Sequence, residues 1–233
     1  MIREDVIIRL VNLIVLWSIF SFAYANEKSE SICYGTPENG SLEEAWQLPT
    51  NGVNFQAYSS LGVGLGRTYV HSKVYSAVVD AYQELAKVRP KTVYVYGETS
   101  AKNGGEFRPH KSHQNGLSVD FMVPVLNSDG GSVPLPTGLL NKFGYGIEFS
   151  DAGVYEGFKI DFEAMADHLI ALNESAGKNG IKIRRVIFDN ALQEKLFKTK
   201  RGDYLKSLMV FSKKPPWVRH DEHYHVDFNV DCK

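Results

Sequence analysis

The segment "WVRHDEHYHVDF", residues 217–228, holds three of the chain's seven histidines and indicates a final β-strand over 223–230. Side chains alternate between the two faces of a strand, so every second residue shares a face. One face carries the polar set of His223, His225 and Asp227, and the other carries the apolar set of Tyr224, Val226 and Phe228. We therefore expect the apolar face to pack against a core and the histidine face to line a site.

A second polar cluster leads into the predicted strand 117–125, "LSVDFMVPV". Asp120 is a lone carboxylate in this apolar stretch, which is costly to bury unless it is paired or binds a metal. His113 precedes it across the flexible "QNG", and only His71 and His168 lie outside the two clusters, where we expect a helix cap and a structural role. Imidazole and carboxylate are zinc ligands. The residues favour a zinc site over chance clustering on an exposed strand or mutual pairing in a core.

The remaining pattern predicts an α+β fold, with a small, mainly antiparallel sheet, flanking helices, long loops and the zinc site at the sheet. The expected elements are helices over 70–90, 160–180 and near 190–209, and strands over 92–98 and 181–189. A polar, glycine-rich loop follows the strand 92–98, and its length suggests a functional loop.

The first 25 residues are typical of a secretory signal peptide. Arg3 and Arg9 precede the apolar run 10–22, and "AYA" at 23–25 is a small-residue cleavage signal. An uncleaved membrane anchor is the alternative, but this run is shorter than the roughly 20 residues needed to span a bilayer. We expect a signal peptide over 1–25, a single domain over 26–233 that carries the zinc site, and no stable membrane anchor after cleavage.

Charge and cysteine content limit the partners and the compartment. The net charge of −1 gives no basic excess, so nucleic acid is not an expected partner. The two cysteines, Cys33 and Cys232, lie near the two ends of the predicted mature chain. In an oxidising compartment we expect a disulfide between them, and two free thiols are the alternative.

The two histidine clusters resemble the signature segments of the penicillin-insensitive murein endopeptidases. This family is grouped with lysostaphin, D-Ala-D-Ala carboxypeptidases and the hedgehog amino-terminal domain. The segments "PHKSHQNGLSVD" and "RHDEHYHVDF" match the family pattern H-x6-D followed by H-x-H at His113, Asp120, His223 and His225. The likeness extends through "LGRTYVHS" and "VYVYGE" to most of the predicted mature chain.

The resemblance implies a periplasmic zinc D,D-endopeptidase that hydrolyses D-alanyl–meso-diaminopimelyl cross-links and acts on peptidoglycan stem peptides. One Zn²⁺ would be held by His113, Asp120 and His225 together with a water. Zinc makes bound water acidic enough to act as hydroxide near neutral pH. His223 and His220 would then be catalytic residues, because a fourth protein ligand would displace the attacking water.

Other roles are less constrained by the pattern. His110 is expected near the metal, Arg108 is expected to meet substrate carboxylates, and Asp227 either orients an imidazole or is a solvated strand-end carboxylate. The general base is a histidine or Glu222, although strand parity turns Glu222 away from His225. Two further functions remain open: a zinc D,D-carboxypeptidase or dipeptidase acting on stem peptides, and a non-catalytic zinc-containing binding module.

Overall fold

The computed structural model describes residues 29–213 and 218–233, so the predicted signal peptide lies outside the described residues. The central sheet has the strand order β12-β13-β7-β6-β4. Only β4 and β6 pair in parallel, and the other neighbours are antiparallel. The strands are β4 (Phe55–Ala57), β6 (Tyr94–Tyr96), β7 (Ser118–Met122), β12 (Lys182–Ile187) and β13 (His223–Asn229). The predicted α+β class with a mainly antiparallel sheet is confirmed.

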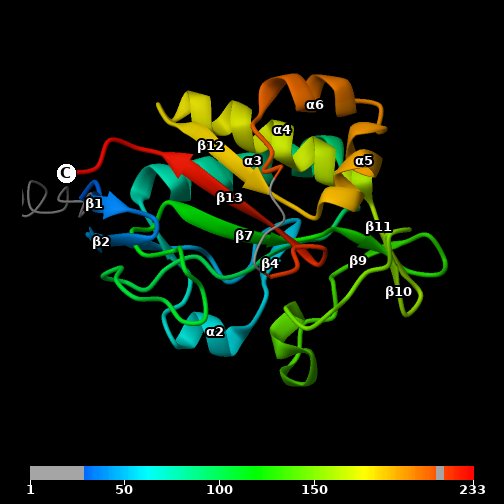
Figure 1. Cartoon of the computed structure of the whole chain (residues 1–233), viewed down its shortest axis with the longest axis horizontal. Helices are drawn as coiled ribbons and strands as arrows, with labels where there is room; N and C mark the ends of the chain where they lie inside the picture. Colours follow the sequence, from blue (N-terminus) through cyan, green and yellow to red (C-terminus); the bar gives the residue numbers. More distant parts are fainter. Residues whose placement is uncertain (1–28, 214–217) are drawn as a thin grey trace, which may run out of the picture.

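The strands β7 and β13 lie side by side at the centre of this sheet, the green and red arrows of Figure 1. Their register pairs His225 with Asp120 and Asp227 with Ser118. Both strands are buried along almost their whole length. Because paired residues point to the same face, this register joins the two polar clusters that lie far apart in the sequence.

Two long helices cover the apolar face of the sheet. These are α3 (Ser72–Val88) and α4 (Phe162–Lys178), which pack against each other. His168 of α4 is fully buried there, and its Nδ1 lies 2.8 Å from the hydroxyl of Tyr224. The structural role expected for His168 therefore agrees with its surroundings.

The single helix expected near 190–209 is wrong, since the chain forms α5 (Asn190–Phe197) and α6 (Gly202–Leu208) there. The chain turns so tightly between them that a Cβ atom at Gly202 would lie 2.2 Å from the carbonyl oxygen of Phe197. A glycine therefore permits the turn, and the helical pattern continues on both sides of it.

Loops and small strands cover the polar face. The segment 97–117, between β6 and β7, contains neither helix nor strand. A 3₁₀ segment, η1 (Leu139–Gly144), leads into Tyr145. The remaining elements are β1 (Ile32–Thr36), β2 (Asn39–Glu43), β3 (Trp46–Gln47), α2 (Ser60–Gly64), β5 (Tyr69–Val70), β8 (Val125–Leu126), β9 (Ser132–Val133), β10 (Val154–Tyr155) and β11 (Phe158–Ile160).

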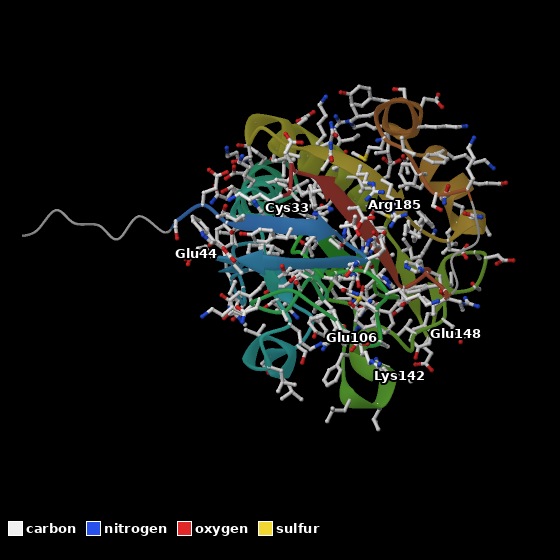
Figure 2. The ribbon with its side chains drawn as sticks, turned by 60° about the vertical axis from the view of Figure 1, so that its left-hand side comes forward. Cys33, Glu44, Glu106, Lys142, Glu148 and Arg185 are labelled. Atoms are coloured by element: carbon white, nitrogen blue, oxygen red, sulfur yellow. A yellow bond between two sulfur atoms is a disulfide. The ribbon has the colours of Figure 1, made fainter. Side chains whose placement is uncertain are left out.

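The two ends of the described chain are joined. Cys33 on β1, labelled in Figure 2, forms the predicted disulfide with Cys232. Around it, the amide of Lys233 donates to the carbonyl of Cys33 at 2.9 Å, and that of Gly35 to the carbonyl of Lys233 at 3.1 Å. Within 29–213 and 218–233, no helix combines the length and the apolar character needed to cross a membrane.

Candidate metal centre and active site

The imidazole of His113 is held with one nitrogen facing the carboxylate of Asp120. Its Nδ1 donates to the carbonyl oxygen of Thr99 at 2.5 Å, because a carbonyl only accepts. Its Nε2 is therefore the unprotonated nitrogen of the neutral ring and lies 3.3 Å from Oδ1 of Asp120. That nitrogen is buried and has no hydrogen-bond partner. A buried unpaired nitrogen facing a carboxylate fits a metal ligand.

His225 approaches the same oxygen from β13. Its Nδ1 lies 2.9 Å from Oδ1 of Asp120, and its Nε2 lies 2.7 Å from Oδ1 of Asp227. Asp227 also accepts from the hydroxyl of Ser118 at 2.6 Å and from Nε of Arg185 on the neighbouring strand β12. A carboxylate that holds the outer nitrogen of an imidazole fixes its ring orientation. Asp227 is thus in contact with His225 and is fully buried, not a solvated strand-end carboxylate.

The second oxygen of Asp120 has different neighbours. The hydroxyl of Tyr145 donates to Oδ2 at 2.9 Å. Nδ1 of His110 lies 3.8 Å from Oδ2, and Nε2 of His223 lies 3.9 Å from it. The Asp120 carboxylate therefore stands between two pairs of histidines, one pair near each oxygen.

His223 is oriented by the residue next to it. Its Nδ1 lies 2.7 Å from Oε1 of Glu222, so its Nε2 faces Asp120. β13 begins at His223, and Glu222 precedes the strand. The other carboxylate oxygen of Glu222, Oε2, is buried without a hydrogen-bond partner. The His220 ring lies 4.5 Å from the His223 ring, and Nδ1 of His220 donates to the carbonyl of Val218 at 2.9 Å.

Burial and neighbouring charges shift the pKa values of these histidines in different directions. Burial lowers the pKa of His113, and burial together with the neighbouring His223 lowers the pKa of His220 to about 3. Burial acts in the same direction on His225, but Asp227 and Asp120 outweigh it and raise the pKa of His225 to about 10.

The pKa values of Asp120, Glu222 and His223 shift for related reasons. Burial opposes ionisation of Asp120, yet the facing imidazoles hold the pKa of Asp120 well below its ordinary value. Burial also disfavours a charged His223, and the carboxylates of Glu222 and Asp120 nevertheless raise the pKa of His223. Burial raises the pKa of Glu222. The site thus contains an ionised carboxylate beside two imidazoles with raised pKa values, His223 and His225, an arrangement in which a cation competes with protons.

A metal ion can be held by His110, His113 and Asp120, whose donor atoms lie within 4.8 Å of one another. His225 is not part of that group, but its Nδ1 lies 2.9 Å from Oδ1 of Asp120, and Nε2 of His113 lies 3.3 Å from the same oxygen. Donors on a tetrahedral zinc ion with bonds of 2.0–2.2 Å lie about 3.3 Å apart. His113 and Asp120 belong to both sets, and His110 and His225 are the candidates for the third donor.

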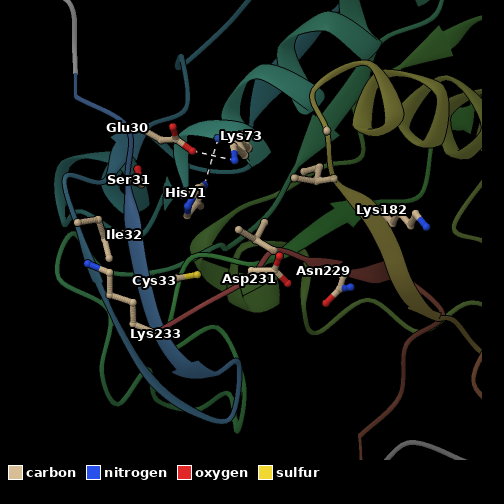
Figure 3. A pocket seen from close by; sticks show the side chains of 13 residues that line it. Glu30, Ser31, Ile32, Cys33, His71, Lys73, Lys182, Asn229, Asp231 and Lys233 are labelled. Atoms are coloured by element: carbon tan, nitrogen blue, oxygen red, sulfur yellow. Dashed lines mark hydrogen bonds and ion pairs between the residues drawn. The ribbon is translucent and has the colours of Figure 1, made fainter.

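Two of the basic groups singled out from the sequence lie outside this cluster. The Arg108 side chain is 84% exposed and pairs with Glu106 at 2.7 Å. His71 caps α3, where its Nδ1 accepts from the amide of Lys73 at 3.2 Å. His71 and Cys33 line a pocket of about 570 Å³, and Figure 3 labels both. The lining of this pocket includes none of the candidate site histidines of 110–113 and 220–225.

Two residues of the site were missed by the sequence-based reasoning. Glu98 follows the buried strand β6, and its carboxylate lies 2.6 Å from Nε2 of His110. A charged residue at the end of the predicted strand 92–98, two positions beyond β6, was the available signal. Tyr145 lies in a loop with no recognisable motif, so only the fold places its hydroxyl on Asp120.

The chain was compared with known proteins. A family model described as penicillin-insensitive murein endopeptidase matches residues 33–233. No curated protein matches the chain. The matched segment includes every residue of the site described above, together with both cysteines of the disulfide.

Proposed function

The chain belongs to the penicillin-insensitive murein endopeptidase family, and from this premise we propose that it is a zinc D,D-endopeptidase. It would hydrolyse the D-alanyl–meso-diaminopimelyl cross-links of peptidoglycan. The observation that carries the zinc part is the convergence of His113 Nε2 and His225 Nδ1 on one oxygen of Asp120. Two nitrogens and one carboxylate oxygen form a donor set typical of catalytic zinc sites.

We assign the metal ligands as His113, Asp120 and His225. The orienting partners support this choice, since Thr99 and Asp227 bind the outer nitrogens of the two histidines. When bound, zinc would polarise the scissile carbonyl and make a water nucleophilic near neutral pH. The tyrosine hydroxyl on Oδ2 supports binding through Oδ1.

His223 is the proposed acid–base residue. Glu222 binds its Nδ1, which directs Nε2 toward Oδ2 of Asp120. The raised pKa of His223 suits a group that takes a proton from water and returns it to the leaving amine. Glu222 then orients this histidine and is not the base. The His220 ring packs beside His223 in a tilted arrangement and remains neutral at physiological pH.

His110 and Arg108 are proposed to meet the substrate from the loop 97–117. His110 lies beside Asp120, where a scissile peptide would enter. The exposed Arg108 is able to exchange Glu106 for a stem-peptide carboxylate, because guanidinium binds carboxylates through paired hydrogen bonds.

The proposed place of action is the periplasm. The family acts on murein, which lies outside the cytoplasm, and the Cys33–Cys232 disulfide fits an oxidising compartment. On this account residues 1–25 are a signal peptide that is removed on export.

Mass analysis of a muropeptide digest tests the activity. Purified protein is incubated with D,D-cross-linked muropeptide dimers, with Asp120→Asn as the inactive control. Release of two intact monomers supports the endopeptidase. Removal of terminal D-alanine alone would indicate the carboxypeptidase alternative, and zinc binding without any cleavage would indicate the binding module.

A further inference from the structure

We propose that Glu98 is a positioning residue that acts through His110 and fixes which nitrogen of His110 faces the reaction centre. The inference rests on the proposed function in one respect, namely that His110 meets the substrate. It assigns to Glu98 a task at the site that is separate from metal binding.

Three residues surround the Glu98 carboxylate with hydrogen-bond donors. It accepts from the hydroxyl of Tyr58 at 2.9 Å, from Nε and Nη2 of Arg67, the latter at 3.0 Å, and from Nε2 of His110 at 2.6 Å. The side chain is only 10% exposed. Two oxygens that receive this many hydrogen bonds have one orientation available, so the acceptor for His110 is fixed in place.

The ion pair of Glu98 with Arg67 determines which nitrogen of His110 faces Asp120. Nε and Nη2 of Arg67 donate to the two carboxylate oxygens. A carboxylate paired in this way only accepts hydrogen bonds, so Nε2 of His110, which faces it at 2.6 Å, carries a proton. Nδ1 faces Oδ2 of Asp120 at 3.8 Å. In the tautomer with its single proton on Nε2, His110 presents an acceptor there, suited to a substrate N–H or to a water.

The backbone of Glu98 also forms hydrogen bonds near Asp120, and these would form with any side chain at position 98. Its carbonyl accepts from the amide of Asp120 at 3.0 Å, and its amide donates to the hydroxyl of Tyr145 at 2.9 Å. These contacts survive a side-chain substitution. A change of the carboxylate therefore isolates its effect on His110 from its effect on the position of Asp120.

A merely structural role must be distinguished, since the carboxylate also neutralises the partly exposed guanidinium of Arg67. In Glu98→Gln the side chain keeps its shape, and one amide nitrogen replaces an acceptor oxygen. If that nitrogen faces His110, Nε2 must accept and the proton moves to Nδ1. The lone pair of His110 then faces away from Asp120. If Glu98 had only a structural role, Glu98→Gln would lower stability without moving this proton.

The test is a double-mutant cycle on kcat/KM for cross-linked dimers, using zinc-loaded Glu98→Gln, His110→Ala and the double variant. We expect Glu98→Gln to lower kcat/KM by about 10–100-fold, the usual effect of losing an orienting partner. In the His110→Ala background the same change should have less than about a 2-fold further effect, because coupled residues are non-additive. Glu84→Gln, an exposed glutamate of α3 paired with Lys87, is the matched control.

Fully additive effects, or wild-type activity in His110→Ala, would overturn the inference. A second measurement does not depend on the variant folding or on turnover: ¹⁵N NMR of the zinc-loaded wild-type protein, with His110 assigned by its absence in His110→Ala. The expected result is a proton on Nε2 of His110, and a proton on Nδ1 alone would overturn the inference. If dimers are not cleaved by the wild-type protein, the proposed function fails while this tautomer still reports on Glu98.

Discussion

At the scale of single residues, the site distinguishes two histidines that the strand places on the same face. His223 and His225 both point toward Asp120, yet their outer partners differ: Glu222 for one and Asp227 for the other. His225 lies within hydrogen-bonding distance of Asp120, whereas His223 stands 3.9 Å away. The closer residue is the proposed metal ligand, and the farther one is the proposed acid–base residue.

This difference predicts unequal effects of two substitutions. His225→Ala should lose most of the bound zinc and all measurable cleavage, because it removes a ligand. His223→Ala should keep stoichiometric zinc and lose about 10²–10⁴-fold in turnover, the range for a lost acid–base group. Metal analysis and dimer cleavage on the same samples measure both. Equal zinc loss in the two variants would mean a closed, structural site.

Tyr145 gives a second prediction at this scale. Its hydroxyl holds Oδ2 of Asp120, so Tyr145→Phe should weaken zinc binding by about 10–100-fold, as expected when a partner of a ligand is removed. Competition with a chelator of known affinity measures the dissociation constant. Tyr204→Phe, an exposed tyrosine, is the control. An unchanged constant in Tyr145→Phe would show that this hydroxyl does not position the ligand.

At the scale of elements, the sequence predicts the sheet better than the loops. The two-residue alternation around Asp120 and His225 predicts which side chains share a face, and the register of β7 and β13 confirms it. Alternation carries no information on which ring nitrogen faces a ligand, because that depends on Thr99, Glu98 and other partners contributed by the loops. The position of Tyr145 likewise depends on tertiary packing.

The packing of α4 on the sheet predicts a pH effect on stability. Burial lowers the pKa of His168 to about 3, so the native state keeps it neutral. The unfolded chain, with a histidine pKa near 6.5, binds the proton more tightly. This contribution to stability is therefore complete above pH 6.5 and is lost as the pH falls below it.

Between pH 7 and pH 5.5 the loss from His168 should be about 1 kcal/mol. His168→Gln is the matched variant, since its side chain keeps a hydrogen-bonding group near Tyr224 without titrating in this range. Urea unfolding at both pH values measures the difference. If the two proteins lose stability equally over this interval, His168 does not contribute as described.

At the scale of the whole molecule, the disulfide joins residues 199 positions apart and ties β1 to the end of the described chain. Such a cross-link restricts the unfolded chain, so reduction should lower the free energy of unfolding by about 2–5 kcal/mol. Denaturant unfolding with and without reductant measures it. The double variant Cys33→Ser, Cys232→Ser is the control, and reductant should not affect it. Equal midpoints for the oxidised and reduced wild-type protein would contradict the prediction.

The dependence of cleavage on zinc tests the central claim most directly. Metal is removed from the purified protein with a chelator, and zinc is returned in measured equivalents while cleavage of cross-linked dimers is followed by mass. The account predicts no cleavage by the metal-free protein and full recovery at one zinc per chain, because the proposed ligands His113, Asp120 and His225 surround one position. Full cleavage by the metal-free protein would contradict it.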